Sequence, residues 1–400
     1  MKPARIPGRL ARLGPWFLLV LFVFTIPWEK SVWVPSIGSI AHFVGLAAFV
    51  AWVLASIRRL DLRRPNAALF LAVAFVLWSA LTYHWSYDRA ATRLRVLTLA
   101  ELLAMLWLIW DLCRGPERQL QLIGAYVSGC VAASLMAFWR YFHHSQTYYL
   151  RYAARGFDPN DFGLILAIAV PMALWLGLHS RAWGRWFWLL SVAVMISAVL
   201  LTASRAATIA TFVAMLFPVF TWRRADWAYR IATAVIAAGL ALSLVRFAPA
   251  PQRQRIATVG TEIVSGTLHN RTRIWKAGFR ALRRRPVRGV GSGAYPKAVE
   301  PWLGKPGVPG FQYVAHNTFL SVLVECGAIG FAIWSLLLAV LAFFVWSLPS
   351  PERALWAVVA SVWAVGVSTL TWEHYKATWL IMALIMTAWA HAGWAQRKCP

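Results

Sequence analysis

A histidine and an asparagine, His316 and Asn317, stand where a basic, polar segment gives way to a long apolar run. The stretch around them, residues 312–330, reads QYVAHNTFLSVLVECGAIG. An imidazole has an unperturbed pKa of about 6.5, so His316 could accept a proton from an attacking hydroxyl near neutral pH. A histidine at a helix start is more often a hydrogen-bonded structural residue, so the choice depends on what lies near it.

Three arginines have the surroundings expected of an anion site. Arg205 lies in LTASRAATIA, among small residues that leave room for a ligand, although a charge at a span end can also simply extend to the interface. Arg271 and Arg273 fall at the start of a predicted helix, residues 271–285, where the helix dipole disfavours cations. That position also offers free backbone N–H groups, and the planar fork of arginine suits phosphate, so an anion-binding role is favoured.

Further polar groups come from the turn RGFDPND, residues 155–161. DPND is typical of a turn, and Asp161 is expected to cap the helix that follows. Arg155, Asn160 and Asp161 of this turn are candidate substrate-binding residues, as is Arg288 beside the flexible glycine turn GVGSG. GVGSG is not a phosphate-binding P-loop, because the Lys-Ser/Thr pair of that motif does not follow it.

Membrane helices must position these residues. Of the 400 residues, 60% are hydrophobic, and the mean hydropathy is +0.59. Apolar runs of about 18 residues or more recur along the chain, and such runs cross the ~30 Å hydrocarbon core of a bilayer as helices. We therefore expect an all-α polytopic membrane protein with about twelve transmembrane helices and one large outer loop containing helical segments. The predicted spans are 14–28, 36–57, 66–84, 90–112, 119–142, 161–179, 185–203, 205–221, 228–246, 316–347, 352–372 and 375–394.

Charge places the candidate residues on one side of the membrane. With the N-terminus inside, the short connections rich in Arg and Lys all fall inside, as the positive-inside rule requires. The chain then divides into nine spans in residues 1–246, an outer loop in 247–315 and three spans in 316–400. Arg205, Arg271, Arg273, His316 and the RGFDPND turn all fall on the outer side.

The outer loop is strongly basic. Residues 246–315 hold thirteen Lys or Arg and two acids, Glu262 and Glu300. A solvated face or adhesion to anionic headgroups would account for this charge, and so would a polyanionic substrate. Nucleic acid is not an expected partner for a loop outside the membrane that has no nucleic-acid-binding motif.

Arginines for phosphate beside one titratable imidazole are the groups needed for transfer from a phosphate leaving group. The imidazole would accept the proton of the attacking hydroxyl, and the guanidiniums would stabilise charge on the departing phosphate. No cluster of acids suggests a metal site on the outer side, so we expect neither a metal nor another cofactor. Glu325, about nine residues into its span, needs a partner, and Arg93 and Arg95 are the candidates.

Four motifs in order resemble the O-antigen ligase and polymerase superfamily: FDPNDFG, the SRAA turn, the run from Arg271 and Trp275 to Pro286, Gly289 and Gly291, and HNTFLSVLVECGAIG. The resemblance covers residues 155–330. It implies a twelve-span bacterial inner-membrane glycosyltransferase with both termini cytoplasmic and a large periplasmic loop. Ligases of the family move O-antigen from undecaprenyl pyrophosphate to lipid A–core oligosaccharide, with inversion.

The resemblance also implies roles for residues. His316 matches the proposed general base of the HN motif, and Arg205 and Arg271 match the arginines that would hold the donor pyrophosphate. Members often read Ser-Gly-Arg before the loop helix, where this chain has His-Asn-Arg-Thr-Arg. Either Arg271 or Arg273 takes the phosphate-binding place, and the four-residue spacing to Trp275 favours Arg271. Asn317 would orient the imidazole, bind sugar or cap the helix.

Two other functions compete with the ligase. An O-antigen polymerase or a protein O-oligosaccharyltransferase would use the same donor with a different acceptor. The many arginines favour a phosphorylated acceptor over a neutral glycan. A transporter of an anionic lipid should show repeated halves and ionisable residues at mid-membrane. Glu101 and Glu325 are candidates for such residues, but no repeat accompanies them.

Overall fold

The computed structural model describes residues 7–34, 38–59, 62–145, 151–242, 271–304 and 312–396. Each predicted span falls on a helix or a pair of helices. The helices are α1 (Pro7–Thr25), α2 (Ile40–Arg59), α3 (Ala67–Leu81), α4 (Arg89–Leu112), α5 (Pro116–Phe142), α6 (Pro159–His179), α7 (Ala182–Leu201), α8 (Arg205–Ala214), α9 (Phe217–Thr221), α10 (Trp227–Leu242), α13 (Arg271–Arg284), α14 (Tyr295–Leu303), α15 (Thr318–Trp346), α16 (Glu352–Val367) and α17 (Lys376–Gln396).

Short elements join some of these helices. Single turns of 3-10 helix follow α1, α3 and α9, at Ile26–Trp28, Thr82–Trp85 and Trp222–Arg224. Two short strands, β1 (Trp33–Val34) and β2 (Gly38–Ser39), pair in antiparallel fashion before α2. The chain is thus a helical polytopic membrane protein. Seven helical stretches in its described part are long and apolar enough to cross a membrane, so the total of twelve spans stays a prediction.

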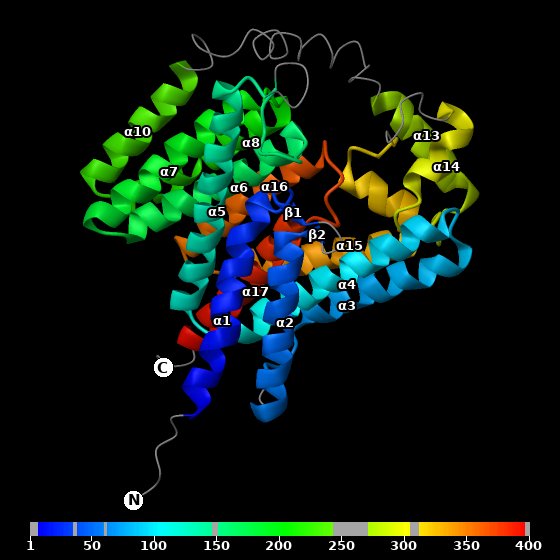
Figure 1. The fold of residues 1–400 in the computed structure, drawn as a ribbon, viewed down its shortest axis with the longest axis horizontal. Helices are drawn as coiled ribbons and strands as arrows, with labels where there is room; N and C mark the ends of the chain where they lie inside the picture. Colours follow the sequence, from blue (N-terminus) through cyan, green and yellow to red (C-terminus); the bar gives the residue numbers. More distant parts are fainter. Residues whose placement is uncertain are drawn as a thin grey trace, which may run out of the picture.

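The most buried helix is α6, which lies at the centre of the molecule among α5, α7, α8 and α16 (Figure 1). Small residues at the contacts let the neighbouring helices approach α6 closely. A Cβ on Gly163 would lie 2.5 Å from Cβ of Ala207 on α8, and a Cβ on Gly366 would collide with a methyl of Leu164. Without interhelical hydrophobic attraction in lipid, such small contacts are the usual way that membrane helices pack.

The predicted span 205–221 is not one helix. It consists of α8 and α9, with a break at Met215 and Leu216. Pro218 explains the break, because proline has no N–H to donate to the carbonyl one turn earlier and its ring collides with that turn.

The predicted span 316–347 also differs from expectation, because α15 is kinked at Gly327, which has φ of +67°. The glycine turn after α13 packs into this kink. Val290 and Gly291 donate backbone N–H groups to the carbonyls of Val324 and Glu325 at 3.0 and 2.9 Å. The turn that looked flexible in sequence is therefore a fixed partner of α15, and it satisfies carbonyls that the kink leaves open.

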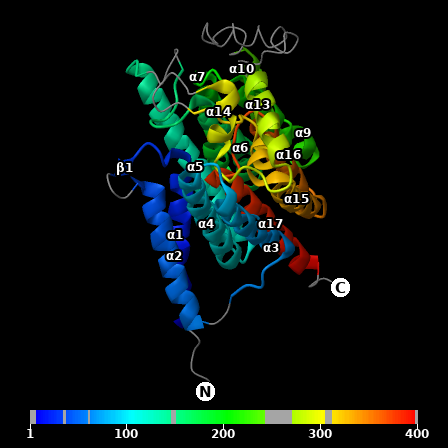
Figure 2. The ribbon, with the colours of Figure 1, turned by 90° about the vertical axis from the view of Figure 1, so that its right-hand side faces the viewer.

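The part of the predicted outer loop that is described packs as a unit on α15. Residues of α13 and α14 share a hydrophobic cluster with Ala315, Leu320 and Val324. Residues 243–270 and 305–311 of that loop lie outside the described residues, and the division of the chain at 246 and 315 stays a prediction. Both views place α13 and α14 at the end of the molecule away from the first turn of α1 and the last turn of α17 (Figures 1 and 2).

Candidate active site

A polar cavity of about 380 Å³ lies where α4, α6, α14 and α15 meet the connection between α16 and α17. Segments far apart in sequence build its wall: the start of α6, the glycine turn, residues 312–316, two turns of α15 and residues 370–375. The lining residues are Arg95, Asp158, Asn160, Asp161, Gly293, Tyr295, Pro296, Gln312, Val314, Ala315, His316, Ser321, Glu325, Leu370, Thr371, His374 and Tyr375.

His316 is held in an unusual backbone conformation beside this cavity. Its φ is +46°, in the left-handed region that costs a non-glycine residue about 1 kcal/mol or more. The next residue, Asn317, is held by two hydrogen bonds of its side chain. Its Oδ1 accepts from the N–H of Leu320 at 2.9 Å, and its Nδ2 donates to the carbonyl of Ser368 at 3.2 Å. Asn317 therefore caps α15, which was one of its predicted roles, and both ends of its amide are engaged.

The imidazole of His316 neither donates nor accepts a hydrogen bond within the described part of the chain. Burial and the nearby charge of Arg271 lower its pKa to about 4, against a weaker opposing effect of Asp158. His316 is therefore neutral at physiological pH. The neutral ring has a nitrogen that can accept a proton. Burial and the charge of Arg271 keep that nitrogen unprotonated in the free protein.

Arg271 and Arg273 differ in their surroundings. Arg271, the first residue of α13, is half-buried, and its charge acts on His316. Arg273 is exposed. One turn after Arg271, the indole Nε1 of Trp275 donates to the carbonyl of Ala315 at 2.8 Å, so α13 is tied to the residue before the histidine. This placement favours Arg271 over Arg273 for a contact inside the site.

Arg205 is the first residue of α8 and follows the N-cap, Ser204. The residue before the cap, Ala203, also has a positive φ, +48°. It does not line the cavity. A residue that sequence reasoning missed connects its turn to the site: the buried Arg151 donates to the carbonyl of Thr202 at 2.7 Å and to Oδ1 of Asn160 at 2.8 Å. The SRAA turn and the DPND turn are thus joined through one buried guanidinium.

The expectation that Asp161 caps α6 was wrong. Asp158 is the N-cap, and its Oδ1 accepts from the N–H of Asn160 at 2.7 Å. Asp161 instead accepts from Nε1 of Trp372 at 2.8 Å and from the hydroxyl of Tyr375 at 2.5 Å. Those two rings stack with centroids 4.8 Å apart, so Asp161 holds an aromatic pair at the cavity.

Two predicted substrate-binding residues lie elsewhere. Arg155 is exposed and lines a separate hollow together with Arg140. Arg288 is exposed as well, with its guanidinium 5.8 Å from the ring of Trp85. The cavity therefore takes in His316, Asn160 and Asp161 of the predicted set, and the charge of Arg271 acts on His316 at its edge, whereas Arg205 is linked to the cavity only through Arg151 and Asn160.

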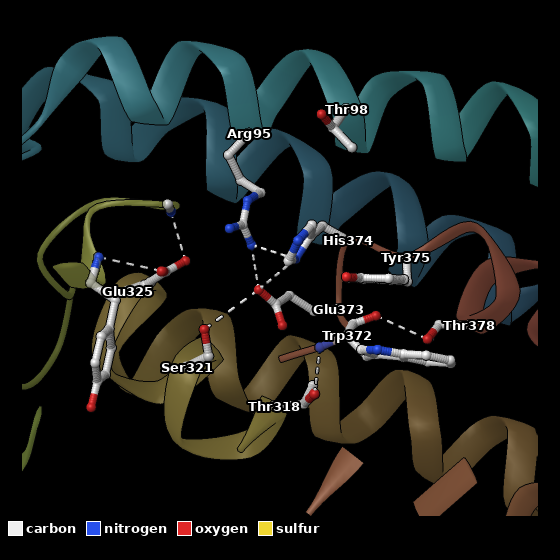
Figure 3. A network of polar contacts seen from close by, with 12 residues as sticks. Arg95, Thr98, Thr318, Ser321, Glu325, Trp372, Glu373, His374, Tyr375 and Thr378 are labelled. Carbon is white, nitrogen blue, oxygen red and sulfur yellow. Dashed lines mark hydrogen bonds and ion pairs between the residues drawn. The ribbon is translucent and has the colours of Figure 1, made fainter. Parts of the chain in front are cut away.

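The cavity also has a wall that the sequence did not reveal (Figure 3). Arg95 on α4 forms a salt bridge with Glu373, and its Nη1 lies 2.8 Å from Nδ1 of His374. Ser321 of α15 donates to the same carboxylate at 3.4 Å. Burial opposes ionisation of Glu373, but the contacts of His374 and Arg95 outweigh it and hold the pKa at about 2. The signal in sequence was the pair Glu373–His374 in a very short connection between two apolar runs.

Glu325 completes this wall. Its carboxylate accepts from the backbone N–H groups of Gly293 at 2.6 Å and Tyr295 at 3.4 Å. Arg95, one of its two predicted partners, is close enough to interact with it electrostatically, but the direct salt bridge of Arg95 is to Glu373. Glu325 therefore anchors the glycine turn to α15. Among the described residues, no group of three or more His, Cys, Asp or Glu side chains is placed to hold a metal ion.

Comparison with known proteins supports the resemblance seen in the motifs. No curated protein matches the chain. The family model described as O-antigen ligase matches residues 190–335, a range that includes Arg205, Arg271 and His316. The resemblance is confirmed: residues 190–335 carry an O-antigen ligase domain, consistent with a member of the O-antigen ligase superfamily.

Proposed function

We propose that the protein is an O-antigen ligase. It transfers glycan from undecaprenyl diphosphate to lipid A–core oligosaccharide at the periplasmic face of the bacterial inner membrane, without metal or other cofactor. The observation that carries this proposal is the position of His316: a neutral imidazole at a polar cavity, beside the charge of Arg271, within the matched ligase domain.

In this reaction, His316 accepts the proton of the acceptor hydroxyl while the hydroxyl oxygen bonds to the anomeric carbon of the donor sugar. The bond from that carbon to the diphosphate oxygen breaks, and the diphosphate leaves with the electron pair. Attack from the face opposite the diphosphate inverts the anomeric centre. The negative donor raises the proton affinity of His316 in the complex, because it offsets the charge of Arg271.

The arginines act on the leaving group. Arg271 and Arg205 hold the diphosphate and stabilise its developing charge. Arg151 is a positioning residue, since it fixes the turn that presents Arg205. Arg273, Arg155 and Arg288 lie on exposed surface and would meet phosphate or glycan outside the cavity. Asn317 and Asp161 act through their neighbours, His316 and Tyr375.

The acceptor is inferred from the surface of α13. Its outer side carries exposed cations at Arg273, Lys276, Arg280, Arg283 and Arg284. A phosphorylated oligosaccharide is attracted to such a surface, whereas a neutral glycan gains nothing from it. This favours lipid A–core over the neutral acceptor of a polymerase.

The site and the termini support the proposed orientation. In both views the first turn of α1 and the last turn of α17 lie in the lower half of the molecule, and α13 and α14 lie in the upper half (Figures 1 and 2). Cytoplasmic termini, which the positive-inside rule favours, would then put the basic helix α13 and the cavity on the periplasmic side.

The test is transfer by purified protein in detergent, with undecaprenyl-diphosphate-linked O-antigen, lipid A–core and EDTA. Glycan on lipid A–core supports the ligase. Lengthening of the glycan on its polyprenyl carrier would instead show a polymerase. If folded protein yields neither product, the proposed function is wrong, and protein acceptors are tested next.

A further inference from the structure

Arg95 and Glu373 both contact Nδ1 of His374 and leave Nε2 of the ring available. Nη1 of Arg95 lies 2.8 Å from Nδ1 of His374. Nδ1 also lies 3.2 Å from Oε1 of Glu373, so the neutral ring either accepts from Arg95 or donates to Glu373 at this nitrogen, and Nε2 is the donor in the first case and the acceptor in the second. Burial, followed by the charge of Arg95, lowers the pKa of His374, which keeps the ring neutral. Glu373 in turn holds Arg95, and Ser321 holds Glu373.

Polar groups of this network remain available to a ligand. Nε2 of His374 makes no hydrogen bond to a described residue, and the hydrogen bonds of Arg95 to described residues all use Nη1. Both side chains line the cavity, together with the hydroxyl-bearing ring of Tyr375 and the carboxylate of Glu325 (Figure 3). The side chains of Arg95 and His374 are 18% and 26% accessible, which leaves the remaining N–H groups of Arg95 and Nε2 of His374 reachable from the cavity.

The charge of this wall decides between two kinds of ligand. The wall carries one guanidinium, that of Arg95, and two carboxyl groups, those of Glu325 and Glu373. At this wall a diphosphate would meet one guanidinium, whose charge the carboxylate of Glu373 already balances. Sugar hydroxyls both donate and accept, so they can bond to the N–H groups and to the carboxylate at once. The ring of Tyr375, which lines the cavity and is backed by the buried ring of Trp372, adds an apolar surface for a sugar ring.

We propose that Arg95, His374, Glu325 and Tyr375 form a sugar-binding subsite facing His316. It holds hydroxyl groups of the glycan during transfer, and the salt bridge between Arg95 and Glu373 positions its donors. The inference rests on the proposed function and adds a division of the cavity: the diphosphate binds on the side of Arg271, and a sugar ring binds on the side of Arg95. The sugar belongs either to the donor or to the acceptor.

Binding to purified full-length protein tests this without requiring turnover. The three probes are undecaprenyl diphosphate without glycan, the same lipid carrying one O-antigen repeat, and core oligosaccharide freed of lipid. We expect His374→Ala to weaken binding of a glycan-bearing probe about tenfold, the effect of losing one hydrogen bond, and to bind the glycan-free lipid like wild type. Loss confined to the repeat-bearing lipid assigns the subsite to the donor sugar, and loss confined to core oligosaccharide assigns it to the acceptor.

Controls separate a local effect from damage to the fold. His391→Ala is the matched substitution, because His391 lies on α17 about 22 Å along the helix from Lys376 and does not line the cavity. It should bind all probes normally. If His374→Ala does not fold, His374→Gln takes its place, since its amide keeps a donor and an acceptor, and it should lose only part of the affinity for glycan. Unchanged binding of every glycan-bearing probe, or equal loss for the glycan-free lipid, would overturn the proposal. Wild-type protein that binds these probes but transfers nothing would refute the ligase function alone.

Discussion

The indole Nε1 of Trp275 donates a hydrogen bond to the carbonyl of Ala315 at 2.8 Å and so joins α13 to the residue before His316. The contact spans forty residues of sequence, part of which lies outside the described residues. It holds Arg271, one turn earlier on the same helix, at the distance from which its charge lowers the pKa of His316. The geometry of the proposed base thus depends on Trp275, a residue that does not line the cavity.

Trp275→Phe should lower the turnover rate about tenfold without unfolding the protein, because it removes one hydrogen bond and keeps most of the apolar contact. Transfer kinetics and gel filtration measure the two effects. Trp302→Phe is the matched control: Trp302 packs on the same cluster, and its indole makes no hydrogen bond to described residues. Equal rates in the two variants would show that the link to Ala315 does not position the base.

On the acid side of its pH profile, kcat/KM for transfer should fall only at low pH. Since the pKa of His316 is about 4, the active neutral form persists as pH falls and is lost only as the pH passes through that value. We expect kcat/KM, which reports the free enzyme, to be independent of His316 titration above about pH 5. Arg271→Gln removes a cation that disfavours the imidazolium, so it should move the limb upward, toward the ordinary value of about 6.5. Arg273→Gln should leave the limb in place, and a midpoint near 6.5 in wild type would contradict this account.

Arg205→Lys should lose at least about tenfold in kcat/KM although the charge is kept, because lysine cannot form the two parallel bonds of a guanidinium to a phosphate. Arg223→Lys, on an exposed turn after α9, provides the control. A fully active Arg205→Lys would mean that Arg205 serves only as a charge at the end of a span.

Gly327→Ala should destabilise the fold by roughly 2 kcal/mol or more, combining a left-handed backbone with overpacking. A Cβ there would collide with the carbonyl oxygen of Val287. Gly239→Ala on α10 is the comparison, since a Cβ at that position would meet no atom within 4 Å and alanine favours a helix. Thermal unfolding in detergent measures both variants, and an unchanged melting temperature for Gly327→Ala would show that the glycine turn is not fixed to α15.

Much of this architecture follows from local sequence. Apolar runs place the helices, because lipid forces each such run to satisfy its own backbone. His316 could be selected because it ends a polar segment beside a span, and Arg271 could be preferred to Arg273 by its spacing to Trp275. The kink at Gly327 was missed because an apolar run with one glycine reads as a continuous helix. Its cause is a partner, the glycine turn, that lies almost forty residues earlier.

The wall of Arg95, Glu373 and His374 could not be predicted for the same reason. Arg95 lies 278 residues from Glu373, and their meeting depends on how α4 packs against α17. Arg151 was missed because its role is to bridge two turns, and no local pattern identifies such a bridge. Asp161 was assigned to the cap because two aspartates flank the DPND turn and sequence alone did not distinguish them.

The most direct test of the central claim compares wild type with His316→Ala in reconstituted transfer. Both proteins receive undecaprenyl-diphosphate-linked O-antigen and lipid A–core in the presence of EDTA, after gel filtration has shown that both are folded. The account predicts glycan on lipid A–core with wild type and a rate lower by about 10² or more with His316→Ala, the usual contribution of a general base. Equal transfer by the two proteins would contradict the role of His316 as the base.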